Sequence, residues 1–170
     1  LAVLVTAPAA ARADLWAYVD ESGRSHFATE PVDVGAMLRE LVMNRVKASG
    51  PRREIEIASM AGSLVALADS GRLRRVLDEL VTNALKFSPP ESLVSIRAER
   101  RSEAAGDVVR VEIVDQGRGM TAQELSTAFQ PFRQLDGSTT RTAGGLGIGL
   151  TSVRRVMELM GGSVVLESEF

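Results

Sequence analysis

A long amphipathic helix, predicted over Gly71–Phe87, constrains the fold of this chain more than any other stretch. At 100° per residue one arc of this helix is apolar and the opposite arc is polar, with Asn83 on the seam between them. Such a face must be buried against a second layer, and a seam side chain can be anchored by packing while it reaches into a cleft. The apolar arc holds Leu73, Val76, Leu77, Leu80, Ala84 and Phe87, and the polar arc holds Arg75, Glu79, Thr82 and Lys86.

Composition excludes several classes of function. The 170 residues are 45% hydrophobic and 25% charged, which is ordinary for one globular domain. A net charge of −2 makes non-specific nucleic-acid binding an unattractive first choice. The absence of cysteine excludes disulfides and thiolate metal sites, and a single histidine, His26, offers little for a zinc site or a Ser-His-Asp triad. The sequence contains no run of about 18 apolar residues, so it predicts no membrane span.

We interpret the first 30 residues as a segment whose relation to the rest of the chain is doubtful. Residues 1–13 resemble the end of a secretory signal, with Ala11-Arg12-Ala13 as a small-x-small cleavage pattern, or else an Ala-rich, poorly ordered terminus. Residues 14–30 predict a small hairpin. Because the sequence pattern changes near Glu30-Pro31, we expect a boundary there and a domain over residues 31–170.

From Pro31 the order of predicted elements is α, β, β, α, β, β, α, loop, α, β. A Thr121–Glu124 capping box marks the third helix, and Gly161-Gly162 ends the last one. This order predicts an α/β (α+β) two-layer sandwich, with helices packed on one face of a mixed sheet. The predicted stretches besides Gly71–Phe87 are Val34–Lys47, Glu54–Ala58, Leu64–Ala68, Leu93–Arg100, Val108–Val114, Ala122–Phe129, a mobile loop over Gln130–Arg141, a helix from near Leu150, and Ser163–Glu167.

Two glycine-rich stretches, Asp115–Met120 and Gly144–Leu150, follow the long helix. Glycines let a backbone approach phosphates closely, and a helix N-terminus offers free N–H groups to an anion. The second stretch opens a helix and fits that physics, although a Gly-rich turn can also be only a tight corner. Neither the usual dinucleotide pattern nor a Gly-Lys-Ser/Thr phosphate loop is matched.

Three polar residues each allow two interpretations. Asp115 can accept a hydrogen bond from an exocyclic amine, or it can stabilise a turn. Asn83 can hold a hydrated Mg²⁺ through its carbonyl oxygen, or it can be solvated. Glu79 can orient a water molecule, or it can pair with Arg75 or Lys86.

Taken in order, the motifs resemble the ATP-binding catalytic domain of sensor histidine kinases, in the GHKL superfamily shared with gyrase, the mismatch-repair ATPase and a heat-shock chaperone. Arg72–Pro89 resembles the asparagine box, Asp115–Met120 the first glycine box, Phe129–Phe132 the phenylalanine box, and Gly144–Leu150 the second glycine box. The resemblance covers about residues 31–170 and implies the histidine-kinase-type ATPase fold.

The resemblance also implies roles for individual residues. Asn83 would coordinate a Mg²⁺ that bridges the phosphates, and Asp115 would bind the adenine amine. Glu79, Asn83 and Lys86 form the implied catalytic set, beside a lid over about residues 132–143. The implied ATP-binding set is Asn83, Lys86, Asp115, Gly117, Gly119, Phe132, Arg141, Gly145, Leu146, Gly147, Ile148, Gly149 and Leu150.

The implied activity is transfer of the ATP γ-phosphate to a histidine on a separate dimerisation domain, with a response-regulator receiver domain downstream. ATP and Mg²⁺ are the implied cofactors, and no nucleic acid is expected as a partner. The alternative is a non-catalytic nucleotide-binding regulatory module or a weak ATPase. A cytoplasmic location is implied, and the signal-like start conflicts with it.

Three features depart from the family. Glu79 stands where Asn is common, which adds some ATPase character. His26 loosely echoes a phosphoacceptor box, but Phe27 replaces the usual acidic residue, so we interpret His26 as an ordinary hairpin residue. The chain ends at Phe170 before the family's last strand, and we expect this loss to expose a sheet edge.

Overall fold

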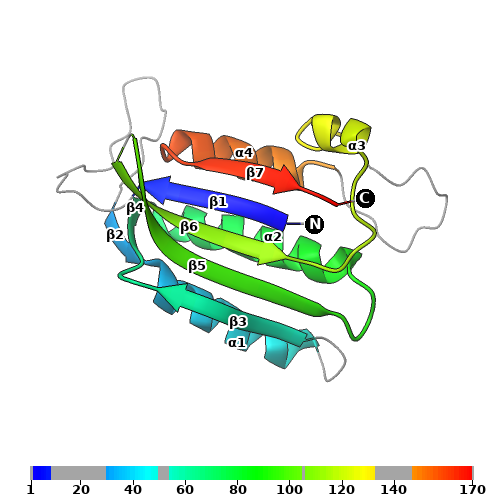
Figure 1. The fold of residues 1–170 in the computed structure, drawn as a ribbon, viewed down its shortest axis with the longest axis horizontal. Coiled ribbons are helices and arrows are strands. Elements are labelled where there is room, and N and C mark those ends of the chain that lie inside the picture. Colours follow the sequence, from blue (N-terminus) through cyan, green and yellow to red (C-terminus); the bar gives the residue numbers. More distant parts are fainter. Residues whose placement is uncertain (1, 9–29, 50–53, 105, 133–146, 170) are drawn as a thin grey trace.

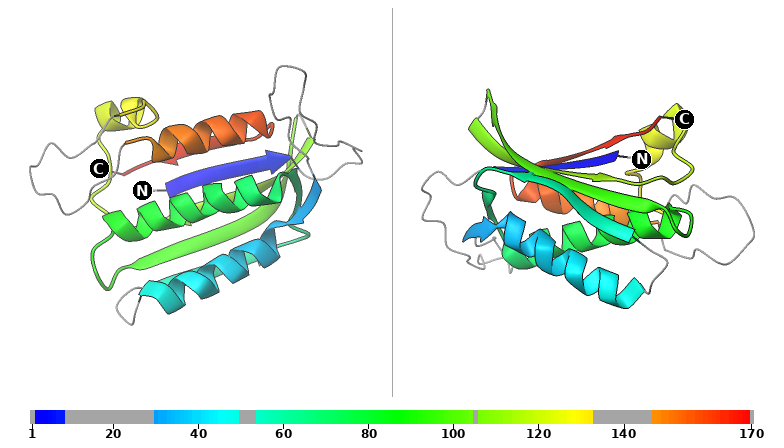
Figure 2. Two further views of the ribbon diagram at one scale, coloured as in Figure 1. Left: turned by 180° about the vertical axis from the view of Figure 1, so that it is seen from behind. Right: turned by 60° about the horizontal axis from the view of Figure 1, so that its bottom comes forward.

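The computed structural model describes residues 2–8, 30–49, 54–104, 106–132 and 147–169. A five-stranded mixed sheet in the order β3-β5-β6-β1-β7 forms one layer, and α1, α2 and α4 cover one of its faces (Figures 1 and 2). This arrangement confirms the predicted two-layer fold. The elements are β1 (Ala2–Pro8), β2 (Glu30–Asp33), α1 (Val34–Ser49), β3 (Glu54–Ala61), β4 (Val65–Ala68), α2 (Ser70–Phe87), β5 (Leu93–Glu103), β6 (Gly106–Val114), α3 (Ala122–Thr127), α4 (Gly149–Leu159) and β7 (Ser163–Glu167).

The central helix α2 begins and ends close to where the sequence predicts. The Asp69 side chain caps its start by accepting the Arg72 N–H at 2.9 Å. Ser88 closes its end, because both its N–H and its hydroxyl donate to the Ala84 carbonyl and Pro89 follows. The buried face consists of Leu73, Val76, Leu77, Leu80, Val81, Ala84 and Leu85.

Phe87 is a correction to the predicted core face, since its side chain is 48% exposed. It is the last residue of α2, and the Lys86 ammonium lies 5.0 Å from its ring centroid. Val81 and Leu85 are buried instead. The helix contacts α1 on one side and α4 on the other, so the buried arc is wider than the predicted apolar arc but ends at Leu85, two residues before Phe87.

The β5–β6 hairpin is longer than predicted. Its inward residues are buried, and its outward positions carry cross-strand charge pairs such as Arg97 with Glu112. The pairing continues to Glu103 and Gly106, where Asp107 accepts hydrogen bonds from Arg100 and Ser102. These bonds stabilise a stretch that the sequence indicated only as a charged turn. The inward residues are Val94, Ile96, Ala98, Val109, Val111 and Ile113.

Helix α1 follows β2 directly, because the Asp33 carboxylate accepts the Ala36 N–H at 2.9 Å. Met37, Leu38 and Leu41 of this helix are buried, whereas Val46 is 43% exposed near its end. β2 pairs antiparallel with β4 in a separate two-stranded sheet. The remaining predicted strands and helices lie within a few residues of their expected positions.

The start of the chain differs most from expectation. Residues 2–8 form β1, which lies between β6 and β7 and pairs antiparallel with both. Val3, Val5 and Ala7 belong to the hydrophobic core, so this stretch packs as part of the sheet. A short apolar run carries no local signal for a pairing with strands about 100 residues away, so the sequence did not predict β1. The predicted hairpin over residues 14–30 lies almost wholly outside the described residues.

Loss of the family's last strand was expected to leave a sheet edge exposed. β7 lies at one edge of the sheet, and β1 stands between it and β6. Within the described residues, no helix is both long and apolar enough to cross a membrane.

Gly162→Ala tests the seating of β1. A Cβ at residue 162 would overlap the backbone carbonyl of Thr6, which cannot move without shifting the whole strand. We expect a loss of roughly 1–3 kcal/mol in the free energy of unfolding, measured by urea denaturation. Gly71→Ala is the matched control, because its Cβ would meet no atom closer than 3.5 Å and alanine favours the helix by up to ~1 kcal/mol. Equal effects of the two changes would contradict the placement of β1.

Candidate nucleotide-binding site

Helix α2 places the predicted catalytic residues along one side. Glu79 and Asn83 are one turn apart and half-buried, and Lys86 is exposed further along. The Asn83 amide nitrogen donates to a Glu79 carboxylate oxygen at 3.4 Å. This orientation leaves the amide oxygen of Asn83 as its group for a cation.

Asp115 directly follows β6 and is one of two buried polar side chains of the described core, at 7% exposure. Its Oδ1 accepts the Gly117 N–H at 2.7 Å, which is the turn-stabilising interaction foreseen as one of its two interpretations. Its adenine-binding role stays a prediction. A Cβ at Gly117 would lie 2.8 Å from the Phe87 carbonyl oxygen, so the first glycine box packs directly on the end of α2. Gly119 has φ +72°, a conformation that favours glycine.

The described part of the second glycine box opens α4. Gly147 has φ +67°, and Ile148 caps the helix without a side-chain hydrogen bond. The first N–H groups of an α-helix have no partner within the helix, so this terminus can receive an anion. Leu150 packs against the core. Arg141, Gly145 and Leu146 lie outside the described residues.

The Glu79 side chain on α2 lies against the described part of the second glycine box. A Cβ on Gly149 would overlap the Glu79 carboxylate, so the polar side of α2 directly faces the first turn of α4. A negative charge near a helix N-terminus is electrostatically favourable. The Glu79 carboxylate therefore lies beside the N-terminus of α4.

The phenylalanine box is tied to the same helix. The Phe132 N–H donates to the Gly147 carbonyl at 3.0 Å, and the Thr151 hydroxyl donates to the Phe129 carbonyl at 2.9 Å. The Phe132 side chain is 78% exposed and its φ is +63°. Sequence reasoning missed Thr151, since a threonine inside a helix carries no signal for such a contact.

Another missed contact joins the first glycine box to the end of the chain. The Met120 N–H donates to the Ser168 hydroxyl at 2.8 Å. Next to it, the predicted capping box of α3 is confirmed between Thr121 and Glu124. The Thr121 backbone N–H, followed by the Arg118 guanidinium at 2.9 Å, holds the pKa of Glu124 below its ordinary value.

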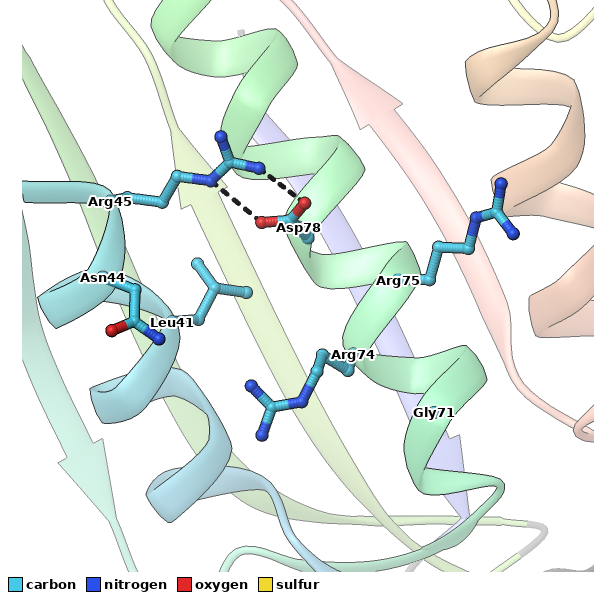
Figure 3. Close-up of a pocket in the computed structure, with 7 residues that line it drawn as sticks. All are labelled: Leu41, Asn44, Arg45, Gly71, Arg74, Arg75 and Asp78. Carbon is cyan, nitrogen blue, oxygen red and sulfur yellow. Dashed lines mark hydrogen bonds and ion pairs between the residues drawn. The ribbon is translucent and has the colours of Figure 1, made fainter. Parts of the chain in front are cut away.

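A cavity of about 380 Å³ lies elsewhere, between α1 and α2 (Figure 3). Arg45 binds Asp78 through two hydrogen bonds of 2.9 and 2.5 Å, and Arg74 binds Glu40 at 2.7 Å, so both pairs bridge the two helices. Arg75 points away from α1. This cavity is distinct from the Asn83–Asp115 region, and none of the predicted site residues lines it. Its lining consists of Leu41, Asn44, Arg45, Gly71, Arg74, Arg75 and Asp78.

Comparison with known proteins names the family of this domain. Residues 68–170 match the family described as Histidine kinase-, DNA gyrase B-, and HSP90-like ATPase. The chain belongs to this family, and sensor histidine kinases are among its relatives. The expected GHKL resemblance is confirmed.

Curated relatives support the same assignment. Sensor protein GacS of Pseudomonas syringae is 34% identical over 138 residues, which cover 77% of this chain and 15% of that protein. Circadian input-output histidine kinase CikA of Synechococcus elongatus is 40% identical over 101 residues, covering 59% and 13%. A non-motile and phage-resistance protein of Caulobacter vibrioides is 29% identical over 151 residues, covering 87% and 18%. The chain thus spans less than a fifth of each of these relatives.

Solved structures share the fold. The mycobacterial sensor histidine kinase MprB superposes with a TM-score of 0.62 at 28% identity, covering 78% of this chain and 80% of that one. Full-length ShkA in complex with AMPPNP gives a TM-score of 0.57 at 28% identity, covering 79% and 27%. These neighbours confirm the expected histidine-kinase-type ATPase fold.

Glu124→Gln should reduce the acid sensitivity of the protein. Because the folded-state pKa of Glu124 is lowered, its charged form contributes stability above the unfolded value of about 4.3, and this contribution is lost as pH falls through the folded value. We expect the stability difference between wild type and variant to be constant near pH 7 and to shrink below about pH 4. Urea denaturation at several pH values measures it. Arg118→Gln should raise the pH at which this contribution is lost, because it removes one of the interactions that lower the pKa of Glu124 in the folded protein.

Gly149→Ala and Glu79→Ala should be strongly coupled. In the wild-type background the new methyl group displaces the Glu79 carboxylate, so we expect Gly149→Ala to destabilise the protein. In the Glu79→Ala background the same change should be neutral or stabilising, because alanine favours a helix over glycine. A double-mutant cycle by urea denaturation should give a coupling energy of about 1 kcal/mol or more. Additive effects would contradict the Glu79–Gly149 contact.

Proposed function

We propose that residues 31–170, completed by β1, are the ATP-binding catalytic module of a two-component sensor kinase. The module transfers the γ-phosphate of ATP to a histidine on a separate dimerisation domain, from which a receiver domain takes it. The observation that carries the proposal is the convergence of Glu79 and Asn83 with the glycine-opened N-terminus of α4. Asp115 supplies the other end of the site. Because such a module needs ATP, we place it in the cytoplasm.

The proposed site holds ATP with the base at the first glycine box and the phosphates at the second. Asp115 accepts a hydrogen bond from the adenine amine, and the missing side chains of Gly117 and Gly119 leave room for the ring. The N–H groups at the start of α4 face the phosphates. The structural neighbour ShkA was solved in complex with AMPPNP, which supports the proposal that a domain of this fold binds a nucleotide.

The residues present fit a Mg²⁺ ion. Among the described residues no cluster of three His, Cys, Asp or Glu side chains could hold a metal by itself. Mg²⁺ suits such a site, because it keeps several waters and binds through few protein oxygens together with substrate phosphates. Asn83 would hold it through its amide oxygen, since the amide nitrogen faces Glu79. When bound, the ion neutralises charge on the phosphates.

The chain's own contribution to transfer is positioning and charge neutralisation. The α4 terminus orients the phosphates, and Lys86 and Arg141 supply positive charge toward them. Phe132, tied to Gly147, stands at the start of the proposed lid. The attacking histidine comes from the dimerisation domain. His26 lies outside the described residues, and we do not assign it this role.

Glu79 supports a second candidate function, a weak ATPase. A carboxylate at the start of α4 is placed to accept a proton from a water molecule that attacks the terminal phosphate. The same geometry also suits a kinase in which Glu79 only orients Asn83. Hydrolysis in the absence of any acceptor domain distinguishes the two functions.

Titration with AMPPNP and Mg²⁺ tests the site. Asp115→Ala should weaken nucleotide binding roughly 10- to 100-fold, because a buried hydrogen bond to a charged group is lost. Asn83→Ala should abolish the dependence of affinity on Mg²⁺. Asn44→Ala on α1 is a matched control, since it makes the same change outside the proposed site. Unchanged affinity for AMPPNP in both site variants would contradict the assignment of the nucleotide site.

A transfer assay tests the reaction. The chain is mixed with a separately produced histidine-kinase dimerisation domain and labelled ATP, and acid-labile phosphohistidine is measured. We expect phosphohistidine with wild type and its loss with Asn83→Ala. Release of inorganic phosphate without phosphohistidine, lost in Glu79→Gln, would favour the ATPase instead.

A further inference from the structure

The cavity between α1 and α2 lies between two arginines that extend in opposite directions (Figure 3). Arg45 extends from α1 to Asp78 on α2, and Arg74 extends from α2 to Glu40 on α1. The cavity volume of about 380 Å³ falls within the range of about 300–1,000 Å³ that is usual for small-molecule sites. It therefore has room for an organic molecule, and the proposed nucleotide site makes no use of this space.

Both guanidinium groups keep N–H donors for such a molecule. A guanidinium carries five N–H donors and no acceptor. Arg45 donates to the Asp78 carboxylate through Nε and Nη2, and Arg74 donates to Glu40 through Nη2 alone. Within the part of the chain that the structure describes, the Nη1 atoms of both arginines and the Nε atom of Arg74 have no protein acceptor. A ligand of this cavity therefore needs acceptor groups.

The two ion pairs also prepare the arginines for binding. The side chains of Arg45 and Arg74 are 32% and 43% exposed, so a molecule from solvent can reach them. The hydrogen bond with Glu40 holds the pKa of Arg74 above its ordinary value, and the charge of Asp78 adds to this effect. Because the carboxylates already restrain both guanidinium groups, a ligand loses less free energy in ordering them.

The charge of the cavity favours an anion. Three arginines against one aspartate give the lining a formal charge of +2, in a chain whose net charge is −2. Glu40 lies outside the lining and lowers the local charge to +1 through its pair with Arg74. Arg75 adds charge without contact, because it points away from α1. Leu41, 3% exposed, supplies an apolar wall.

From these observations we propose that the cavity binds a small dicarboxylate, with one carboxylate at Arg45 and the other at Arg74. Carboxylates are the matching group, since a planar carboxylate accepts parallel N–H bonds from a guanidinium and both arginines already bind one in this structure. The methylene groups between the two carboxylates lie against Leu41 and the arginine stems. The inference is independent of the proposed nucleotide function.

An NMR titration tests the proposal. The full ¹⁵N-labelled chain, without nucleotide, is titrated with malonate, succinate, glutarate and adipate at constant ionic strength. We expect saturable shifts of the Gly71 and Asn44 backbone N–H signals with at least one of these diacids, because both residues line the cavity. Acetate at twice the concentration is the control, and it should bind at least about 10-fold more weakly because it cannot contact both arginines at once.

Arginine-to-lysine variants test the role of the guanidinium groups. Arg45→Lys and Arg74→Lys keep the positive charge and remove the planar fork, so each should weaken binding of the diacid about 10-fold. Arg97→Lys is the matched control, because Arg97 is ion-paired with Glu112 on the sheet and lies outside the cavity. The NMR spectrum of each variant reports whether it is folded.

Several outcomes would overturn the inference. These are no saturable shift with any of the four diacids, equal binding of acetate, and unchanged affinity in both Arg45→Lys and Arg74→Lys. Shifts confined to Gly149 and Leu150 would place the anion at the start of α4 and would also overturn it. Saturable binding of a diacid in a protein that does not bind AMPPNP would refute the proposed nucleotide function alone.

Discussion

The fold depends on the burial of one helix face against one sheet face. The apolar arc of α2 lies on the sheet, with α1 and α4 on its two sides. Leu77 and Leu80 are almost completely inaccessible to solvent, and truncation of such residues to alanine costs about 2–5 kcal/mol. Because this packing sets the rotation of α2, it also sets where Glu79 and Asn83 point. The site is a consequence of the core.

Close approaches at the middle and at the C-terminal end of that helix build the site. Near its middle, the Glu79 carboxylate occupies the space that a side chain at Gly149 would need, and at its end the Phe87 carbonyl does the same for Gly117. The glycines therefore serve packing between elements as well as any ligand. This double role explains why isolated glycine stretches are ambiguous in a sequence but informative together with a helix that faces them.

The position of Glu79 bears on whether the domain would act as a kinase or as an ATPase. Glu79 lies against the start of α4 and beside Asn83, so in the proposed site its carboxylate either orients the Asn83 amide or activates water. Family membership rests on residues 68–170, whereas the sheet needs β1 from outside that range. The residues that match the family and the strand that completes the sheet are thus separate parts of the chain.

The sequence by itself determined whatever depends on neighbouring residues. Helical periodicity predicted α2, the Thr121–Glu124 pattern predicted a capping box that forms as expected, and the ordered motifs predicted the family. The tertiary structure alone decided the exposure of Phe87, the Glu79–Gly149 contact and the place of β1. Each of these depends on contacts between residues far apart in the chain, and such contacts leave no periodic trace in a short apolar or polar stretch.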